Sequence, residues 1–506
     1  MRKRAIVLII ALVVCSVLAA GVVWAGKSDD TLNILLQVEL SHIDNYFNTD
    51  RVGVIVSRHI WDSLLYRDPK TSEYKPLLAT SYKWVNDTTM DLELRKGVKF
   101  HNGEKFDADD VVYTLNWVSD PKNGVKSQRI VAWIKNCEKL GDYKVRIHTK
   151  QPFPAALEFL SGSLAIYPNE YYAKVGPKGM GAKPVGTGPY KVTEVVPGQK
   201  IVMVKNKDYF KDSPKGRPHI GKLQIRFIKE VNTEIAEIMS GRADWMWGAS
   251  ADQAERLKKT PKLTVTNAQT MRIFYLTFGA ADKGKINSPM SNVLVRKAVA
   301  HAIDRETILK TLVMGSSKLV NAACFPTQLG CINPPAYDYN PEKAKKLLAQ
   351  AGLPNGFEFE FYGYRGPKLM EAMVSYLKAV GIKAKMVMGT YAATRDKIRA
   401  GRVPMAMMSW GSYSVNDASA CTSIFFRGSA DDNAMDPKVM EWLKTADTNV
   451  DVATRKKYYK LALERIADQV YWLPLWSHSR NYVYTKDLDF TPTPDEIPRW
   501  FTSKWK

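Results

Sequence analysis

Histidine and cysteine are common metal ligands and common groups in covalent catalysis, and both occur in this chain. The seven histidines are scattered from His42 to His478 without the spacing of metal ligands, and no GxSxG, HExxH or kinase signature is present. The cysteines have neither CxxC spacing nor a nearby histidine pair, which disfavours a zinc site. We therefore expect no metal, no cofactor and no enzymatic activity, with a hydrolase assembled from residues distant in sequence as the minor alternative.

A glycine-rich turn at Gly186, Thr187 and Gly188 is the next feature with chemical potential. A phosphate-binding loop of this kind needs a following Lys-Ser/Thr pair and a helix. Pro189 and Tyr190 follow instead. The pattern predicts a tight turn into a strand and argues against a nucleotide site.

Four cysteines lie beyond the first 25 residues: Cys137, Cys324, Cys331 and Cys421. In an oxidising compartment Cys324 and Cys331 are close enough in sequence to close a short loop, with roughly 2–3 kcal/mol of stabilisation. Two unrelated thiols are the alternative, and four cysteines allow three full pairings. We expect the Cys324–Cys331 disulfide.

The first 25 residues have the three parts of an export signal. Residues 2–4 are basic, residues 5–14 are an uninterrupted apolar run, and Val23-Trp24-Ala25 is a small-x-small processing site. We expect cleavage after Ala25 and a periplasmic location. An uncleaved anchor is the alternative, because an apolar stretch of roughly 20 residues can span a bilayer. A retained leader would indicate a tethered sensory or assembly receptor.

The chain is basic, with a net charge of +22 that falls to +19 without the three basic residues of the leader. Lys and Arg are interleaved with Asp and Glu throughout, and the short basic runs at 343–346 and 455–457 lie in helix-like segments, where a solvated face is expected. No motif for reading DNA or RNA accompanies the charge. We therefore exclude nucleic acid as a partner.

The elements that position these residues alternate between strand-like and helix-like segments, which predicts an α/β fold. The pattern predicts a first strand over 31–36, a helix over 54–65, and a loop between them at 37–49, where open α/β sheets place ligand contacts. It restarts with a strand over 273–278 and a long helix over 295–313.

About 480 residues remain after the leader. A single hydrophobic core rarely extends beyond roughly 250–300 residues, so more than one core is expected. We expect a first lobe that contains an inserted subdomain, a second lobe, and a C-terminal return to the first lobe, so that two crossings form a hinge. The expected divisions are 1–25 (signal peptide), 26–67 (first lobe), 68–167 (inserted subdomain), 168–266 (first lobe), 267–479 (second lobe) and 480–506 (return).

Several separate stretches, in a fixed order, resemble a known family. They are WVND (84–87), LELRKGVKFHNG (92–103), FDADDVVY (106–113), PVGTGPY (184–190), NKDYF (206–210), VRKAVAHAIDR (295–305) and YNPEKAKKLLAQAG (339–352). Together they resemble family 5 of the extracytoplasmic solute-binding proteins, which serve peptide, opine and nickel importers. The resemblance covers nearly the whole chain beyond the leader.

The resemblance implies a two-lobed periplasmic-binding-protein fold of type II, in the large cluster with an extra subdomain in the first lobe. It implies a monomer that captures a small solute between its lobes and delivers it to the permease of an ABC transporter in the inner membrane. A peptide or peptide-like solute is expected. A non-peptide solute such as an opine, a sugar derivative or a chelated metal is the alternative.

The resemblance also suggests which charged residues contact the solute. In dipeptide binders of the family, an aspartate in a segment after a Trp-rich strand binds the amine; the matching segment, 409–418, departs from the usual WGxDYPDP pattern. The expected acid aligns with Asn416, or with Asp417 after a one-residue slip, although an Asn-Asp pair is also ordinary turn or helix-cap chemistry. Arg365 matches the carboxylate-binding arginine in position, and its planar fork suits a carboxylate. A surface arginine on a turn is the alternative for Arg365.

Four aromatic residues complete the predicted site. Trp245, Trp247, Trp410 and Tyr413 fall at strand ends that are expected to face the cleft, where flat rings can cover an apolar or sugar face of a ligand. A core or interface position is the alternative for each of them.

Overall fold

A computed structural model of the chain describes residues 26–40, 42–48, 50–126, 128–281 and 288–506, without the side chains of Arg129 and Tyr413. The predicted leader and its cleavage site lie outside the described residues. Strands and helices alternate along the described chain, which confirms the predicted α/β class. None of the helices in these ranges is long and apolar enough to cross a membrane.

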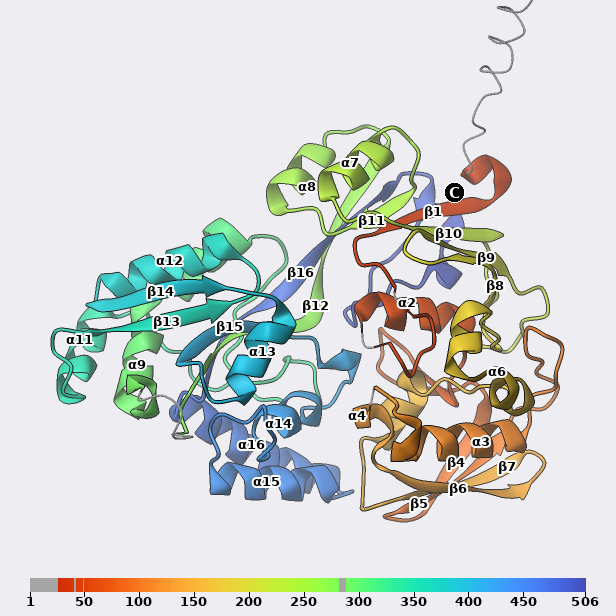
Figure 1. Cartoon of the computed structure of the whole chain (residues 1–506), viewed down its shortest axis with the longest axis horizontal. Helices are drawn as coiled ribbons and strands as arrows, with labels where there is room; N and C mark the ends of the chain where they lie inside the picture. The colour runs from red at the N-terminus through yellow and green to blue at the C-terminus, as the bar shows by residue number, and fades with distance from the viewer. Residues whose placement is uncertain (1–25, 41, 49, 127, 282–287) are drawn as a thin grey trace, which may run out of the picture.

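Within the described residues, ten strands form one continuous sheet that joins two lobes (Figure 1). The strand order is β14-β13-β15-β12-β16-β11-β1-β10-β9-β8. The first lobe contributes β1 (Thr31–Leu36), β8 (Tyr190–Val196), β9 (Lys200–Lys205), β10 (Lys222–Phe227) and β11 (Trp245–Trp247). The second lobe contributes β13 (Phe357–Gly363), β14 (Ile382–Met388) and β15 (Met405–Trp410).

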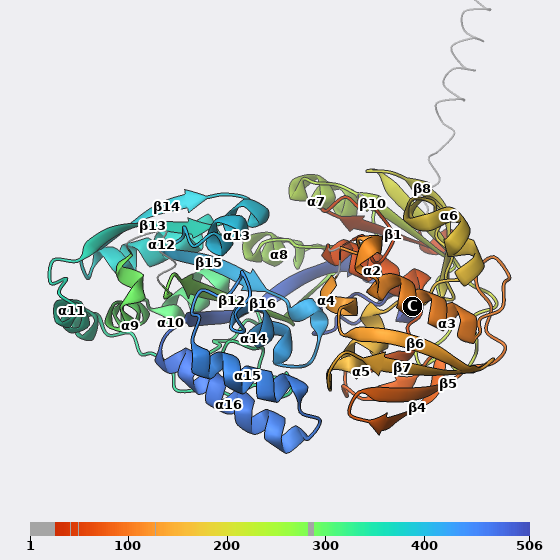
Figure 2. The same ribbon diagram turned by 60° about the horizontal axis from the view of Figure 1, so that its bottom comes forward.

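Two long strands connect the lobes, β12 (Leu263–Phe278) and β16 (Trp472–Thr485). They pair antiparallel along their length, and the register shifts between Gln269 and Ile273, where an irregularity interrupts the ladder. Both views show these strands running between the two halves of the molecule (Figures 1 and 2). The two strands are hydrogen-bonded to each other, so the connection between the lobes is sheet. The predicted lobe divisions at 266 and 479 lie inside β12 and β16.

The remaining elements of the first lobe surround its part of the sheet. A separate four-stranded sheet, in the order β4-β5-β7-β6, comprises β4 (Ala79–Asn86), β5 (Thr89–Leu94), β6 (Ile134–Gly141) and β7 (Lys144–Thr149). The helices are α2 (Arg51–Ile60), α3 (Ala108–Ser119), α4 (Gln128–Val131), α5 (Ala156–Glu158), α6 (Asn169–Ala182), α7 (Val231–Met239) and α8 (Ala251–Leu257). Two further sheets have two strands each: β2 (Leu65–Arg67) pairs with β3 (Tyr74–Pro76), and β17 (Leu488–Asp489) pairs with β18 (Lys504–Trp505).

The second lobe covers its part of the sheet with helices. They are α9 (Val293–Ala302), α10 (Arg305–Ile308), α11 (Pro341–Gln350), α12 (Pro367–Lys378), α13 (Tyr391–Arg399), α14 (Ser419–Phe425), α15 (Pro437–Thr448) and α16 (Val452–Asp468). A short 3-10 turn, η6 (Ser412–Ser414), links β15 to α14.

Local sequence signals explain several element boundaries. The predicted first strand matches β1. Asp107 is the N-cap of α3, and its side chain accepts a hydrogen bond from the Asp109 amide. The helix predicted over 295–313 is wrong in its length. Asp304 caps a new helix through the Thr307 amide, so α9 ends at Ala302 and α10 begins at Arg305.

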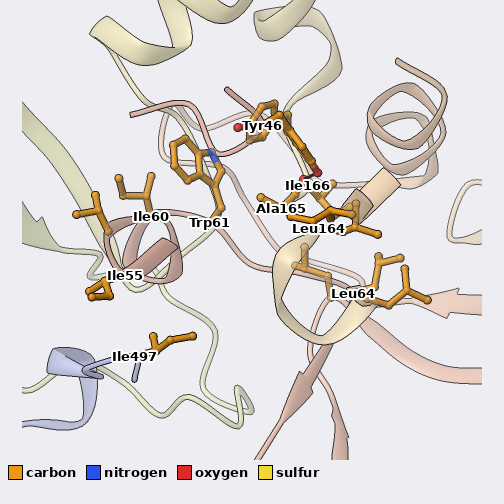
Figure 3. Close-up of a cluster of buried hydrophobic side chains, with 14 of the residues drawn as sticks. Tyr46, Ile55, Ile60, Trp61, Leu64, Leu164, Ala165, Ile166 and Ile497 are labelled. Atoms are coloured by element: carbon orange, nitrogen blue, oxygen red, sulfur yellow. Dashed lines mark hydrogen bonds between the residues drawn. The ribbon is translucent and has the colours of Figure 1, made fainter. Parts of the chain in front are cut away.

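The core of the first lobe forms around α2, which begins at Arg51 and ends at Ile60, earlier than the predicted 54–65. Figure 3 shows Ile55 and Ile60 of this helix in a buried cluster that also contains Ile497 of the C-terminal return. His59 joins the same segments, because its Nε2 accepts a hydrogen bond from the Trp500 amide. Burial lowers the pKa of His59 to about 3, so the ring is neutral. The C-terminal segment is thus part of the first lobe's core.

The glycine-rich turn is fixed by close packing against the end of α2. The Ile60 carbonyl accepts a hydrogen bond from the Gly188 amide, and a Cβ on Gly186 would lie 2.2 Å from that same Ile60 oxygen. The turn therefore requires glycine for close backbone approach, and it leads into β8 as the sequence predicts.

We expect Gly186→Ala to lower the free energy of unfolding by about 1–3 kcal/mol, because the new Cβ overlaps backbone that cannot move aside cheaply. Urea unfolding of the purified protein measures the change. Gly141→Ala is the matched control, since its Cβ would meet nothing closer than the Lys144 Cβ at 3.9 Å. Equal losses in the two variants would contradict the explanation.

Candidate functional site

The two lobes meet along residues 411–417, which we call the seam segment. It follows β15 of the second lobe and contains η6. Ser412 and Ser414 have φ angles of 51° and 65°, in the left-handed region that ordinary residues avoid. Such backbone strain, of the order of 1–3 kcal/mol per residue, is commonly found at functional sites and is maintained by surrounding contacts.

Contacts from the first lobe hold the seam segment in place. Arg51 Nη1 donates a 2.7 Å hydrogen bond to Ser414 Oγ, and Arg67 Nη2 donates a 2.7 Å bond to the Ser414 carbonyl. The Asn416 amide donates a 2.7 Å bond to Glu158 Oε2. The structure thus holds the lobes in contact through charge-assisted hydrogen bonds, which are stronger than neutral ones.

A disulfide loop supports the seam segment from the second-lobe side. The structure contains the Cys324–Cys331 disulfide. Inside the loop, Gln328 Nε2 donates to the Val415 carbonyl at 2.7 Å, and the Leu329 amide donates to the Asn416 carbonyl at 3.1 Å. The bridge therefore orients backbone that lies between the lobes.

A pocket of about 350 Å³ lies at the start of the seam segment, and we call it the cleft pocket. It is lined by Asp50, Arg51 and Val54 of the first lobe, Arg272 of β12, and Tyr364, Arg365, Tyr391, Arg395, Ser409, Trp410, Gly411 and Ser412. Its two walls therefore come from different lobes, so a bound solute would contact both.

Most of the cations around the cleft pocket have internal partners. Arg395 makes a two-pronged pair with Asp431, at 2.8 and 2.7 Å. The carboxylate of Glu496 is 3.3 Å from Arg51 Nε and 3.2 Å from Arg272 Nη2, and it also accepts from Arg480 Nε at 2.6 Å.

Glu496 is therefore the electrostatic centre of this cluster. Its side chain is 2% exposed and its φ is 60°. Burial alone would raise the pKa of Glu496, but Arg272, Arg480 and Arg51 together hold that pKa well below its usual value. One carboxylate thus neutralises part of the charge of three guanidinium groups, and the cluster remains cationic.

Arg365 is the cation that the described residues leave available. No hydrogen bond or ion pair joins its guanidinium to another described residue, and its nearest aromatic contact is the Tyr364 ring, 4.7 Å from the guanidinium carbon to the ring centre. The Arg365 side chain is exposed at the mouth of the pocket. Partial desolvation, followed by repulsion from Arg272 and Arg480, lowers the pKa of Arg365, although a guanidinium stays protonated in proteins. Its N–H groups are available to donate two parallel hydrogen bonds to a carboxylate.

The other predicted acid and amide lie elsewhere. Asn416 and Asp417 border a second pocket, of about 560 Å³, together with Tyr74 and Trp84. The carboxylate of Asp417 is 2.8 Å from Arg455 Nη2, and both side chains are 3% exposed. This corrects the expectation that Asp417 and Arg365 meet in one site: they line different pockets, and Asp417 already has a buried cation as its partner.

Two of the predicted aromatics are in the core. Trp245 is fully buried, with its ring centre 5.6 Å from that of Phe490 and 5.3 Å from that of Trp500. Trp247 is also buried, under the Arg480 guanidinium at 4.2 Å. The expectation that they face the cleft is wrong, because β11 pairs with β1 and β16 inside the sheet and the C-terminal return covers it.

Trp410 lines the cleft pocket, and its indole Nε1 donates a 2.8 Å hydrogen bond to the Ala420 carbonyl. Tyr364 and Tyr391 add two further rings, which meet edge to face at 5.2 Å. The side chain of Tyr413 lies outside the described residues.

Sequence reasoning missed the basic residues that frame the pocket. Arg51 follows the loop predicted to carry ligand contacts, and Arg272 directly precedes the apolar run of a predicted strand. The register shift in β12 places Arg272 in an irregularity, a feature that redirects side chains at the edges of sites. Glu496 carries no local signal.

Comparisons with known proteins agree with this architecture. The family model for bacterial extracellular solute-binding proteins, family 5 Middle, matches residues 73–433. Heme-binding protein A of Haemophilus influenzae is 26% identical over 460 residues, which are 84% of this chain and 82% of that protein. The glutathione-binding protein GsiB of Escherichia coli strain K12 is 27% identical over 499 residues, which are 95% of this chain and 94% of that protein.

A solved structure confirms the two-lobed periplasmic-binding-protein fold. The dipeptide-binding protein of Pseudoalteromonas sp. SM9913, in complex with Met-Leu, matches with a TM-score of 0.80 at 23% identity. The match covers 94% of this chain and 100% of that chain.

We expect Glu496→Gln to lower the free energy of unfolding by about 3–5 kcal/mol, because it leaves buried arginines without their anion. The wild-type contribution is fully present above the usual pKa of 4.5 and is lost as the pH falls toward the depressed folded-state value. Acidification below 4.5 should therefore destabilise the variant less steeply. Urea titrations at several pH values measure both effects. Glu255→Gln, in an exposed pair with Lys258, is the control and should change stability little; a parallel response in both variants would count against the cluster.

Removing the disulfide with Cys324→Ser and Cys331→Ser should lower the free energy of unfolding by about 2–3 kcal/mol and loosen the seam segment that the loop supports. Thermal unfolding with and without a reductant measures the effect. The reductant should lower the melting temperature of the wild type and leave the double variant unchanged. A wild-type protein that is insensitive to full reduction would refute the stabilising role.

Proposed function

The chain belongs to the bacterial extracellular solute-binding proteins of family 5, and we propose that it is the periplasmic binding component of an ABC importer. In this proposal it is a non-catalytic monomer, exported with a cleaved signal peptide, that holds a peptide-like solute with at least one carboxylate in the cleft pocket. It then delivers the solute to the permease in the inner membrane.

The observation that carries the proposal is the availability of Arg365 in a pocket with few acids. Asp50 is the acidic residue among the described lining residues, against Arg51, Arg272, Arg365 and Arg395. Even with Glu496 and Asp431 as partners, the surroundings favour an anion. A guanidinium binds a carboxylate through two parallel hydrogen bonds, which gives both affinity and orientation.

The aromatic walls and the size of the pocket support a small organic solute. Trp410, Tyr364 and Tyr391 provide flat apolar surface, and about 350 Å³ is within the range of small-molecule sites. Heme, glutathione and Met-Leu, which the names of the relatives and the solved structure give as their ligands, all carry carboxylates.

Contacts from both lobes explain how the solute would promote closure. Asp50 lies on the first-lobe wall of the pocket and Arg365 on the second-lobe wall. A solute with an amine near Asp50 and a carboxylate on Arg365 binds the closed form more tightly than the open form. Only such a difference in affinity shifts the equilibrium between the two forms.

A non-peptide anion, such as an opine, is the second candidate. The internal pair between Asp417 and Arg455 favours it, because this acid is not available for a peptide amine. A solute with more carboxylates than amines fits the excess of arginine.

The function is tested by screening dipeptides, tripeptides, opines and metal chelates for a rise in the melting temperature, since a ligand of the native state stabilises it. Arg365→Gln should weaken the affinity for the solute that is found by about 10- to 100-fold, the loss expected for hydrogen bonds to a charged group. Titration calorimetry measures the affinity.

Arg402→Gln, an exposed arginine of the same lobe, is the matched control and should leave the affinity unchanged. Small-angle scattering should show a smaller radius of gyration with the solute than without it. Wild-type affinity in Arg365→Gln would exclude this residue as the carboxylate site, and scattering that stays the same at confirmed occupancy would exclude closure.

A further inference from the structure

A separate small cavity lies behind the seam segment, on the first-lobe side. Its volume is about 40 Å³, far smaller than the cleft pocket. Ser414 and Val415 cover it from the second lobe, and the other lining residues belong to the first lobe and the C-terminal return. The charged side chains that line it are Arg58, Arg67, Glu158, Lys215, Asp495 and Arg499.

Three of the four cations in this lining are paired. Arg67 Nε lies 3.3 Å from Glu158, and Lys215 Nζ lies 2.6 Å from Asp62, which is just outside the lining. Lys215 also donates to two backbone carbonyls, so its three donors are used. Both terminal nitrogens of Arg499 donate hydrogen bonds to the Asp495 carboxylate. Burial alone would raise the pKa of Asp495, but Arg499 holds it well below its usual value.

Arg58 is the fourth cation, and its guanidinium has no hydrogen bond or ion pair with any residue in the described part of the chain. The charged groups nearest to it are mostly other cations. Burial, followed by the repulsion of Arg499, lowers the pKa of Arg58 to about 9, with further lowering from Arg67 and Arg51. The carboxylate of Asp495 attracts it but is already shared by Arg499 and Thr493.

The Arg58 guanidinium packs closely against Gly162. A Cβ on Gly162, another lining residue, would lie 2.5 Å from Arg58 Nη2. Glycine at this position therefore lets the planar group lie flat against backbone at the cavity wall. Arg58 itself is partly buried.

An unpaired guanidinium in this partly buried cavity is unfavourable, because removing a charge from water costs free energy unless an opposite charge pairs with it. A cavity needs about 10–15 Å³ to hold one water molecule, so about 40 Å³ accommodates a small ion. With Asp62, the local charges sum to one excess positive charge, and that charge is Arg58.

We propose that this cavity binds one small monovalent anion, a halide or a carboxylate group, on the guanidinium of Arg58. The site is distinct from the cleft pocket and does not depend on the identity of the solute held there. Because Ser414 and Val415 close the cavity, the anion neutralises the first-lobe surface on which the seam segment rests. Its occupancy should therefore favour contact between the lobes.

Bromide gives a direct test with the unmodified protein. Crystals grown or soaked in sodium bromide should show an anomalous difference peak within hydrogen-bonding reach of the Arg58 guanidinium. This measurement decides the question even if substitutions at Arg58 prevent folding.

Melting temperatures give the second test. The protein is dialysed into sodium gluconate, whose anion is too large for the cavity, and is titrated with chloride or formate at constant ionic strength. The wild type should melt about 2 °C higher with about 0.1 M of the effective anion. Arg58→Met should lose this dependence, whereas Arg256→Met, which removes an exposed arginine of α8, should keep it.

The two anions separate the two sources of the ligand. A response to chloride that Arg58→Met abolishes supports a free halide at the site. A response to formate alone, again abolished by Arg58→Met, supports the carboxylate of a captured molecule. Absence of a bromide peak at Arg58, together with equal chloride and formate responses in the wild type and Arg58→Met, would overturn the proposal.

Discussion

Two arginines of the first lobe hold Ser414 in its strained conformation, and the same hydrogen bonds join the two lobes. Its left-handed backbone is unfavourable for a residue with a side chain. Arg51 bonds its hydroxyl and Arg67 bonds its carbonyl, while the disulfide loop fixes the neighbouring Val415 and Asn416. The strain is sustained because contacts from both lobes converge on the same few backbone atoms, so separation of the lobes would release the arginines and the strained segment together.

The arginines that hold the seam also determine what the seam can bind. Buried charges must be paired, and the cleft contains fewer acids than arginines. Glu496 forms ion pairs with three guanidinium groups, and Asp431 forms one with Arg395. The balance leaves Arg365 facing the cleft pocket and Arg58 facing the small cavity. Arg58 belongs to a cationic first-lobe surface that a polar segment of the second lobe covers, whereas Arg365 belongs to the second-lobe wall of the cleft pocket. The proposed preference for an anionic ligand rests on that shortage of acids.

The connection between the lobes limits how they can move. Strands β12 and β16 stay paired on both sides of the crossing, so the lobes cannot swing freely on a loop. The register shift near Arg272 interrupts the ladder between the lobes, and irregularities of this kind bend strands locally. Arg272 lies in this irregularity, and its guanidinium contacts Glu496 in the electrostatic cluster of the cleft.

The sequence by itself determined the local backbone and the family. The first strand, the glycine turn and the Cys324–Cys331 bridge could be predicted because each rests on residues close together in the chain, and the family could be predicted from an ordered set of motifs. Tertiary structure decided the rest. Arg51 forms an ion pair with Glu496, and Arg455 forms one with Asp417, although the partners are distant in sequence. Trp245 is buried against Trp500 of the C-terminal return. Local patterns report backbone preference and amphipathicity, but the partner of a buried charge and the exposure of a ring are set by which distant segments pack together.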